Sequence, residues 1–437
     1  MALKGLIIAA PSSGAGKTVV TLGLLRALQR QGVNICSAKS GPDYIDPAFH
    51  AAATGKDCIN LDAWAMPPAA LRAMAHRQPS GLLLIEGAMG LFDAAPVTGQ
   101  AMGKGSVADL AETLDLPVVL VVDVARQAQT VAPVVAGLAG FRKNVKIAGV
   151  ILNRVGSAKH RMMIEHAFTD IPVLGAVPRD ARMARESRHL GLVQAGEDEN
   201  LERFIQGAAD VVAEGVDLTA LSAIAKGLPT AGDTPHVAPL GQHIAVAQDE
   251  AFAFAYPHML EGWRAAGAEL SFFSPLNNEG PTKGADAVFL PGGYPELHAG
   301  KLAGASRFMT ELRTTKALIY GECGGYMALG KGLIDAAGQR HEMLGLLPVS
   351  TSFATRKLHL GYRMLEALSG PMQGQQLPAH EFHYASIAES QPANLFAVQN
   401  SMGEDLGVLG HSRGRVSGSF AHVISMPETS LDGPSNP

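Results

Sequence analysis

Residues 6–18, LIIAAPSSGAGKT, decide the fold of the first half of this 437-residue chain. An apolar run leads into a glycine-rich loop, and a helical pattern follows the loop. In such a loop backbone N–H groups surround phosphate oxygens, a lysine reaches them and a hydroxyl binds Mg²⁺. Gly14 and Gly16 allow the backbone to approach the phosphates closely, Lys17 supplies the charge and Thr18 supplies the hydroxyl. The order strand, loop, helix therefore predicts a nucleotide-binding phosphate loop.

Short apolar runs alternate with helical segments through this half of the chain. Helical patterns such as Val19–Gln31 and Gln127–Ala139 separate the runs. Continuous apolar strands that alternate with helices are typical of a parallel sheet covered on both faces. The predicted strands are Leu6–Ala10, Val33–Ala38, Leu82–Glu86, Val118–Asp123, Lys146–Leu152 and Pro172–Ala176.

Carboxylates follow two of these strands. Residues 40–47, SGPDYIDP, follow the second strand, and residues 86–93, EGAMGLFD, follow the third. A doubly wound sheet binds its ligand beyond the carboxyl ends of the strands. Nucleotide-bound Mg²⁺ needs a carboxylate near the threonine hydroxyl, so we expect Thr18, Glu86 and Asp43 to hold the ion. Each carboxylate alone is more typical of a helix cap, but their grouping beside a phosphate loop favours a metal site.

Two further polar residues end strands in this half. Asn153 ends the strand KIAGVILNR, and its amide is a candidate for reading the edge of an adenine ring. Asp123 ends VVLVVD and is either another acid of the site or a cap at Ala125.

The second half begins after residues 228–242, LPTAGDTPHVAPLGQ, which contain three prolines and no apolar periodicity. This stretch is the predicted linker. Strand and helix alternation then resumes, so we predict two α/β domains at residues 1–235 and 242–430. The new strands are His243–Gln248, Glu269–Phe273, Ala287–Leu290 and Ala317–Tyr320.

A cysteine follows the last of these strands. Gly321, Cys323 and Gly325 form the pattern G-x-C-x-G, which predicts a nucleophile elbow on a sharp strand-to-helix turn. A lone cysteine is usually an inert core residue, and we assign that role to Cys36 and Cys58. At Cys323 the flanking glycines favour catalysis, and the amino end of the following helix is expected to lower the thiol pKa.

The nucleophile needs an oxyanion hole and a base. Gly292 and Gly293 end the preceding strand, and their backbone N–H groups are candidates for the oxyanion hole. His422, in the late segment GSFAH, stands out among the candidate bases, although spacing alone does not select it. The candidate bases are His359, His380, His383, His411 and His422.

Composition limits the function classes. The formal net charge of −5, from 35 basic and 40 acidic side chains, argues against a nucleic-acid binder that relies on a strong positive field. Three cysteines exclude a disulfide scaffold and favour a reducing compartment. No apolar stretch reaches the ~18 residues of a membrane helix without interruption. We therefore expect a cytoplasmic protein that binds neither nucleic acid nor a membrane.

Together these segments resemble the cobyrinic (hydrogenobyrinic) acid a,c-diamide synthases of vitamin B12 biosynthesis. The resemblance covers nearly the whole chain and implies two three-layer α/β domains. The first is a P-loop NTPase-like parallel sheet similar to dethiobiotin synthetase, and the second is a class I glutamine amidotransferase domain of flavodoxin-like form. The motifs that carry the resemblance are APSSGAGKT, KSGPDYIDP, EGAMGLFD, RHLGL at Arg188–Leu192, PGGYPE, GECGGYMALG, HEFHY at His380–Tyr384 and GSFAH.

The resemblance implies a carbon–nitrogen ligase with ATP and Mg²⁺ as cofactors and with glutamine and a corrin precursor as partners. Glutamine is hydrolysed at the cysteine, and the ammonia passes to the synthetase domain. There ATP phosphorylates the c and then the a carboxylate, and ammonia displaces the phosphate. A homodimer is the candidate assembly.

Residue roles follow from the same resemblance. It implies that His422 activates Cys323, and that the segment Asp43, Tyr44, Ile45 and Asp46 handles the tetrapyrrole. Many class I relatives have an acid two residues after the histidine, where this chain has Ile424, so the third member of the Cys–His site stays open. Pro11 replaces the usual first glycine of the phosphate loop, a position at which related enzymes vary.

Two alternatives remain. One is amidation of another tetrapyrrole, such as nickel-sirohydrochlorin. The other is a partition-type P-loop ATPase fused to a non-catalytic binding domain, against which the intact elbow and His422 argue. The sequence does not decide the metal content of the substrate, the order of amidation or the oligomeric state.

Overall fold

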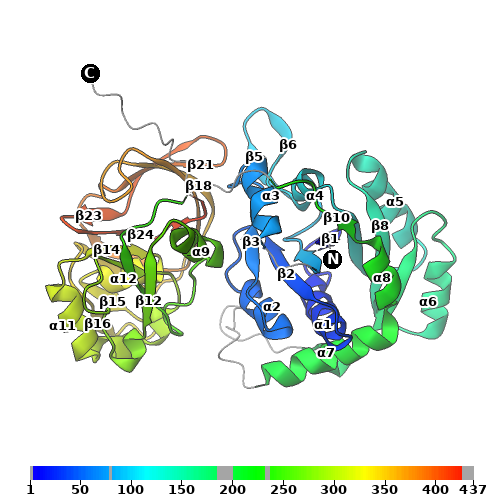
Figure 1. Cartoon of the computed structure of the whole chain (residues 1–437), viewed down its shortest axis with the longest axis horizontal. Helices are drawn as coiled ribbons and strands as arrows, with labels where there is room; N and C mark the ends of the chain where they lie inside the picture. The colour runs from blue at the N-terminus through cyan, green and yellow to red at the C-terminus, as the bar shows by residue number, and fades with distance from the viewer. Residues whose placement is uncertain (1–2, 78–80, 185–199, 232–236, 426–437) are drawn as a thin grey trace. The chain divides into compact units, whose positions relative to one another are not determined.

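A computed structural model describes residues 3–77, 81–184, 200–231 and 237–425. The chain divides into two compact units (Figure 1). Unit 1 comprises Met1–Ala95 and Gln100–Thr234, and unit 2 comprises Pro96–Gly99 and Pro235–Pro437. The predicted domain limits, 1–235 and 242–430, stay a prediction. The RHLGL motif, Arg188–Leu192, lies outside the described residues.

Unit 1 is built on one twisted sheet in the order β3-β2-β4-β1-β7-β8-β9. These seven strands are parallel, and β10 pairs antiparallel with β1. Strands β2 to β4 lie on one side of β1, and strands β7 to β9 lie on the other. The loop after β1 therefore lies at the point where the strand order reverses. The strands are β1 (Lys4–Ala9), β2 (Ile35–Ser40), β3 (Ile59–Leu61), β4 (Leu82–Glu86), β7 (Val118–Asp123), β8 (Ile147–Val155), β9 (Val173–Pro178) and β10 (Lys226–Gly227).

Helices cover both faces of this sheet. Figure 1 shows α1 and α7 packed together on one side and α3 and α4 on the other. Gly23 of α1 permits the close contact with α7, because a Cβ there would lie 2.7 Å from the carbonyl oxygen of Ala208. The helices of unit 1 are α1 (Lys17–Arg30), α2 (Asp46–Thr54), α3 (Pro68–His76), α4 (Val107–Leu114), α5 (Val131–Phe141), α6 (Ala158–Glu165), α7 (Leu201–Gly215), α8 (Leu218–Ile224) and the 3-10 turn η1 (Ala181–Met183). A hairpin, β5 (Ala95–Val97) and β6 (Gln100–Lys104), follows β4.

Unit 2 contains a second sheet, in the order β12-β11-β13-β14-β24-β23. All but the edge strand β23 are parallel, and the apolar side chains of this sheet form the core with α10 to α12. The strands are β11 (His243–Ala247), β12 (Glu269–Phe273), β13 (Ala287–Leu290), β14 (Leu318–Glu322), β23 (His411–Arg413) and β24 (Val416–Ser419). The helices are α9 (Pro257–Ala265), η4 (Pro275–Asn277), η5 (Pro295–Leu297), α10 (Ala299–Ala303), α11 (Ser306–Thr314) and α12 (Gly324–Leu329).

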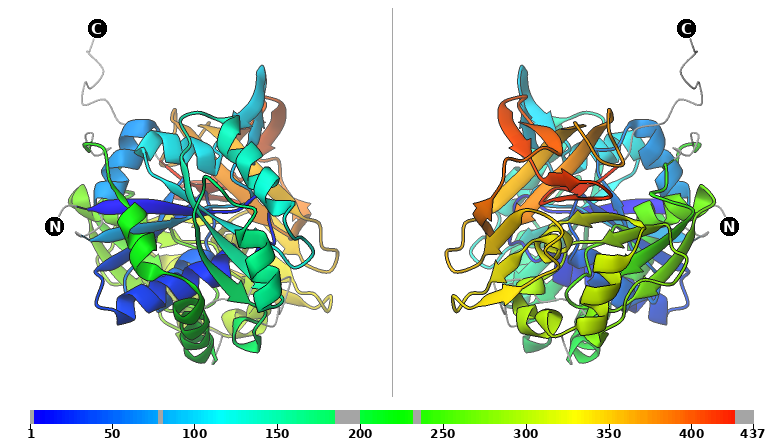
Figure 2. Two further views of the ribbon diagram at one scale, coloured as in Figure 1. Left: turned by 90° about the vertical axis from the view of Figure 1, so that its right-hand side faces the viewer. Right: turned by 90° about the vertical axis from the view of Figure 1, so that its left-hand side faces the viewer.

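Two smaller sheets complete unit 2. One has the order β16-β15-β17-β20, and the other has the antiparallel order β22-β21-β18-β19-β25. Figure 2 shows the latter in orange and red. Their strands are β15 (Gly332–Ile334), β16 (Arg340–Glu342), β17 (Val349–Ser352), β18 (His359–Ala367), β19 (Gln376–His383), β20 (Ser386–Ser390), β21 (Phe396–Asn400), β22 (Asp405–Leu409) and β25 (His422–Val423).

The predicted α/β fold class is confirmed. Leu82–Glu86, Val118–Asp123, Glu269–Phe273 and Ala287–Leu290 are observed with the predicted ends, and the other predicted strands are observed within three residues of theirs. The two smaller sheets after residue 330, one mixed and one antiparallel, were not predicted. Among the described residues, no helix has the length and apolar character needed to cross a bilayer.

Candidate functional site

The phosphate loop connects the carboxyl end of β1 to the first residue of α1. Gly14 and Gly16 have φ angles of 79° and 85°, in the left-handed region where a side chain is strained. Lys17 begins the helix, and its Nζ donates a hydrogen bond of 2.5 Å to the carbonyl oxygen of Met89. Burial lowers the pKa of Lys17, and the negative charge of Glu86 only partly offsets this effect. The loop, lysine and helix end are therefore arranged as a phosphate site requires.

Thr18 and the acids meet beside this loop. The Thr18 hydroxyl donates to Oε1 of Glu86 at 2.6 Å and lies 3.4 Å from Oδ2 of Asp46. Glu86 ends β4 and is fully buried. The structure thus brings together two of the three predicted metal ligands, Thr18 and Glu86, and adds Asp46, which the sequence had assigned to the substrate.

Lys39 is a residue of this site that the sequence reasoning missed. It is the register partner of Glu86 in the neighbouring strand β2. Its Nζ donates to Oδ2 of Asp46 at 2.6 Å and to Oε1 of Glu86 at 2.9 Å. Burial alone would lower the pKa of Lys39, but the charges of the nearby acids raise it, so the ammonium stays charged. Its place inside KSGPDYIDP was the available signal.

His50 of α2 is a second missed residue. Its Nε2 lies 2.6 Å from Oε2 of Glu86, and its Nδ1 lies 3.5 Å from Sγ of Cys58. Burial alone would lower the pKa of His50, but Cys58 and Glu86 raise it to about 10. Burial alone would raise the pKa of Glu86, but Lys39 and His50 hold it below its ordinary range. The buried carboxylate is thus charged and doubly paired.

Asp43, the third predicted metal ligand, lies in the turn before α2, and its role stays a prediction. Its Oδ1 accepts from the backbone N–H groups of Ile45 and Asp46, at 2.7 and 3.2 Å, so it caps the turn that starts α2. Its Oδ2 lies 4.0 Å from Nζ of Lys39. Partial burial and the charge of Asp46 raise the pKa of Asp43 to about 6. Tyr44 and Ile45 are partly buried in the same turn.

Asn153 lies under the phosphate loop. Its Nδ2 donates to the carbonyl oxygen of Ala15 at 2.8 Å, and its Oδ1 accepts from the N–H of Arg154. Adenine recognition by this amide would require these bonds to exchange, so its cofactor contact stays a prediction. Asp123 accepts from the N–H of Ala125 and pairs with Arg154, which supports the capping alternative.

The donor set near Thr18 fits a hard cation. A hydroxyl and the carboxylates of Glu86 and Asp46 are the oxygen ligands that Mg²⁺ takes beside a nucleotide phosphate. Lys39 already lies between the two carboxylates, which shows that the pocket accommodates a positive charge.

Unit 2 contains the predicted nucleophile elbow. Cys323, between β14 and α12, has φ 46° and ψ −103°, a strained conformation typical of active-site residues. The flanking glycines allow the helix to pass close to the sheet. A Cβ on Gly325 would lie 1.9 Å from the carbonyl oxygen of Leu290, and one on Gly321 would lie 2.6 Å from Leu329. The strand, turn and helix around Cys323 are therefore as G-x-C-x-G predicts.

His422 of β25 lies next to this elbow. A Cβ on Gly292 would lie 2.2 Å from Cε1 of His422 and 3.3 Å from Cβ of Cys323, so both side chains border Gly292. A Cβ on Gly324, the residue after the nucleophile, would lie 2.9 Å from the backbone nitrogen of Gly293. The structure thus brings together Cys323, His422 and the two candidate oxyanion glycines.

The electrostatics of the pair differ from the expectation. Burial, followed by the charge of Glu296, raises the pKa of the Cys323 thiol, and the hydrogen bond from the Gly324 N–H only partly opposes this. Burial, with His380 and His383, lowers the pKa of His422 to about 3. The expected helix effect on the thiol pKa is therefore outweighed, because α12 has only six residues and the thiol is buried. At rest the pair is a thiol and a neutral imidazole.

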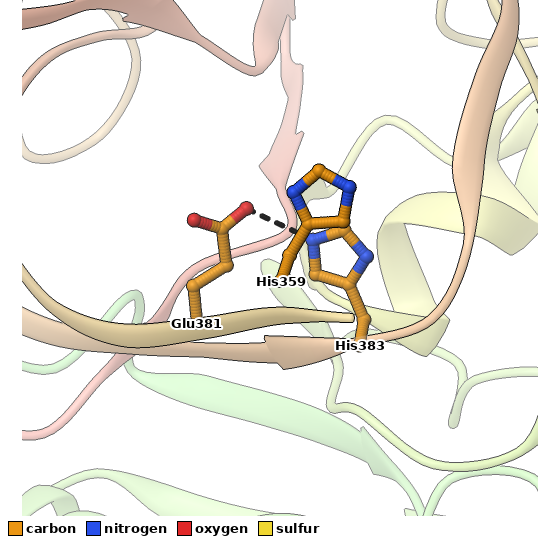
Figure 3. A group of neighbouring side chains, drawn as sticks. All are labelled: His359, Glu381 and His383. Carbon is orange, nitrogen blue, oxygen red and sulfur yellow. Dashed lines mark hydrogen bonds and ion pairs between the residues drawn. The ribbon is translucent and has the colours of Figure 1, made fainter. Parts of the chain in front are cut away.

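The other candidate bases have contacts of their own, and His380 is the register partner of His422. His411 Nδ1 lies 2.6 Å from the Tyr326 hydroxyl. His359 and His383 stack across β18 and β19 at a centroid distance of 4.7 Å, with Glu381 beside them (Figure 3).

This His359–Glu381–His383 cluster offers three ligand atoms within 4.8 Å of one another. Its ring planes are only 5° apart, so the in-plane lone pairs do not converge on one point. Oε2 of Glu381 also pairs with Nε of Arg363 at 2.8 Å. The observed arrangement is an ion-paired stack, in which His383 also stacks on Phe420 at 3.9 Å. It supports the segment that leads to His422.

Both units match known domain families. Residues 6–193 match the family described as the CobQ/CobB/MinD/ParA nucleotide binding domain, and residues 243–429 match the CobB/CobQ-like glutamine amidotransferase domain. A nucleotide-binding unit joined to a glutamine amidotransferase unit defines the class, a glutamine-dependent amidating ligase.

Full-length relatives identify the family. The chain is 56% identical over 434 residues to a hydrogenobyrinate a,c-diamide synthase from Brucella anthropi, covering 97% of this chain and 98% of the relative. It is 52% identical to one from Rhizobium meliloti, covering 98% and 100%, and 48% identical to one from Mesorhizobium japonicum, covering 97% and 99%. The chain belongs to the hydrogenobyrinate a,c-diamide synthase family, which confirms the resemblance predicted from the motifs.

Proposed function

We propose that the chain converts hydrogenobyrinic acid to its a,c-diamide, using glutamine as the nitrogen donor and ATP to activate each carboxylate. The observation that carries this proposal is that one chain combines the elbow of Cys323 and His422 with the buried cluster of Lys17, Thr18 and Glu86. The first supports release of ammonia from an amide, and the second supports transfer of a phosphoryl group. An amidating ligase needs both reactions.

Unit 2 would release the ammonia. Cys323 Sγ attacks the side-chain amide carbon of glutamine while His422 accepts the thiol proton. Backbone N–H groups at Gly293 and Gly324, beside the predicted Gly292, would stabilise the oxyanion of the tetrahedral intermediate. His422 then returns the proton to the leaving ammonia, which leaves a thioester on Cys323. Water hydrolyses the thioester to glutamate and restores the thiol. Because both groups are uncharged at rest, this proton transfer accompanies the attack.

Unit 1 would use that ammonia. A peripheral carboxylate of the substrate attacks the γ-phosphorus of ATP, and ADP leaves. Ammonia then attacks the resulting acyl phosphate, and inorganic phosphate leaves as the amide forms. Lys17 and the loop N–H groups would hold the phosphates, and Lys39 would balance the charge that develops between them and the acids. A free carboxylate is a poor acyl donor, so this activation is what the phosphate loop contributes.

We further propose that Mg²⁺ binds at Thr18, Glu86 and Asp46, with Asp43 at the edge of the site. The ion would neutralise phosphate charge during transfer. The chain's own residues then position it: His50 and Lys39 keep Glu86 charged and oriented. The turn formed by Asp43, Tyr44 and Ile45 adjoins these acids, which supports its role in presenting the substrate carboxylate.

The test is mass spectrometry of three tetrapyrroles incubated with the enzyme, glutamine and ATP. The tetrapyrroles are hydrogenobyrinic acid, cobyrinic acid and nickel-sirohydrochlorin. We expect two successive amide gains on hydrogenobyrinic acid. Preferred amidation of either metal-containing substrate would overturn the substrate assignment, and ATP hydrolysis with no amidated product would favour the partition-type ATPase. The cytoplasmic location and the homodimer stay predictions.

A further inference from the structure

Many class I glutamine amidotransferases have an acid two residues after the catalytic histidine, and this chain has no acid there. The residue two places after His422 is Ile424, which is buried and apolar, and whose carbonyl oxygen bonds to Nε2 of His258. A different acid faces the imidazole. Oε2 of Glu322 lies 3.7 Å from Nδ1 of His422. Cε1 and Nε2 of the ring border Gly292 and the nucleophile.

Glu322 is held in place by its own contacts. It is the last residue of β14, directly before Cys323, and is 4% exposed. Its Oε1 accepts a hydrogen bond of 3.1 Å from the N–H of Val423, the residue after His422. The register of β14 with β24 also pairs Glu322 with Ser419, at the start of the segment that leads to His422. Strand pairing and this hydrogen bond thus fix the carboxylate beside the imidazole.

We propose that Glu322 is the positioning residue for His422. An acid immediately before the nucleophile thus takes the place of the acid that many class I amidotransferases have after the histidine. This inference rests on the proposed glutaminase role of Cys323 and His422. When His422 accepts the thiol proton, its Nδ1–H points at Glu322, and the carboxylate balances the imidazolium charge. The 3.7 Å separation exceeds a hydrogen bond, and such contacts commonly tighten when substrate binds.

The charges around the pair make this partner necessary. His380 and His383 of β19 face His422 and disfavour its protonation, as does burial. Glu296, Glu381 and Glu322 itself face Cys323 and disfavour the thiolate, so Glu322 acts on the pair through the imidazole. Glu322 is the carboxylate that lies within ion-pair range of Nδ1. Burial raises the pKa of Glu322 to about 8, so its charge should balance a protonated His422 most effectively above that pH.

The experiment compares Glu322→Gln, Glu322→Asp and the control Glu342→Gln, which removes an exposed carboxylate from β16. The amide oxygen of Glu322→Gln can still accept from the Val423 N–H, so the variant removes charge and little else. At pH 9, where the wild-type carboxyl is charged, we expect the glutaminase kcat of Glu322→Gln to fall about 10²-fold with KM within threefold, because general acid–base catalysis contributes on that order. Glu342→Gln should match the wild type.

The pH dependence separates positioning from structure. We expect the ratio of the wild-type glutaminase kcat to that of Glu322→Gln to rise between about pH 7 and 9, because the Glu322 carboxyl ionises over this range. Glu322→Asp, which keeps the charge, should retain that rise. The proposal would be overturned if Glu322→Gln had the wild-type kcat and the wild-type pH profile of glutaminase activity. It would also be overturned if Glu322→Gln and Glu322→Asp lost kcat equally and kept the wild-type pH profile. Amidation with ammonium should persist in both variants. If the wild type itself showed no amidation with ammonium, that result would count against the proposed function instead.

Discussion

At the scale of single residues, the nucleotide site depends on Lys17, whose ammonium is buried at the loop and bonded to a backbone carbonyl. Lys17→Ala removes the positive charge that would hold the phosphates. We expect ATP-dependent amidation to be lost while glutamine hydrolysis persists at least in part, because Cys323 lies in the other unit. Unchanged amidation in this variant, followed by mass spectrometry, would contradict the assignment of the phosphate loop.

Glu86 tests the proposed metal position. Glu86→Gln keeps an oxygen for the Thr18 hydroxyl but removes the carboxylate charge, so the affinity for Mg²⁺ should fall. We expect phosphoryl transfer to slow by orders of magnitude and the Mg²⁺ concentration at half-maximal rate to rise. The readout is ADP release across a Mg²⁺ titration. Normal rates at low Mg²⁺ would place the ion elsewhere.

The strongest local signals were predictable at this scale. Gly14, Gly16, Lys17 and Thr18 are adjacent in sequence, and Cys323 has its glycines beside it, so short-range patterns determine their arrangement. Lys39 and Glu322 were missed because no local sequence pattern marks either residue. Their significance depends on a neighbour that is distant in sequence and brought close by strand register.

At the scale of elements, the elbow depends on the close passage of α12 over β13. Gly325→Ala would place a Cβ 1.9 Å from the carbonyl oxygen of Leu290, a backbone atom that cannot move without displacing the strand. We expect a destabilisation of ~1–3 kcal/mol and a large loss of glutaminase activity. Gly300→Ala on α10 is the matched control, because the nearest atom to its Cβ is 3.7 Å away. Urea unfolding checks both, and equal stability of the two variants would contradict the packing account.

The bonds that join α2 to β4 predict a pH dependence of stability in unit 1. The pKa of His50 is raised to about 10, so its contribution is complete below its unfolded value, about 6.5, and is lost as the pH rises through 10. The pKa of Glu86 is lowered, so its contribution is complete above about 4.5 and is lost in acid.

His50→Gln should therefore lose less stability at pH 9.5 than at pH 6. Trp64 lies in unit 1 and Trp263 in unit 2, and the chain has two tryptophans, so Trp64 fluorescence in a Trp263→Phe background reports on unit 1. Urea unfolding of this background, with and without His50→Gln, gives the difference at each pH. A difference that grows between pH 6 and 9.5 would contradict the assigned pairing.

Element prediction succeeded where the pattern was local and strong. Most parallel strands of the two main sheets are apolar runs that are buried on both faces, and their positions were predicted closely. The short strands β3 and β24 of these sheets were not predicted. Apart from β18 and β19, the later strands β15 to β25 have five residues or fewer, so each is too short for its alternation to be recognised. Their pairing, such as β18 with β19 and β19 with β25, is set by contacts distant in sequence.

At the scale of the whole molecule, the residues that we propose for each reaction lie within one unit. The phosphate loop, Thr18, Lys39 and Glu86 belong to unit 1, whereas Cys323, His422 and Glu322 belong to unit 2. Ammonia is then the only chemical species that the proposed reaction needs to pass from one unit to the other. The two reactions should therefore be separable by the choice of nitrogen source.

The most direct test is amidation of hydrogenobyrinic acid by Cys323→Ala, with ATP and either glutamine or a high concentration of ammonium at alkaline pH. We expect no amidated product with glutamine, because no thioester can form, and the a,c-diamide with ammonium. Mass spectrometry of both reactions beside the wild type gives the result. Full glutamine-dependent activity in Cys323→Ala, or equal loss of activity with both nitrogen sources in a folded protein, would contradict the division of labour between the two units.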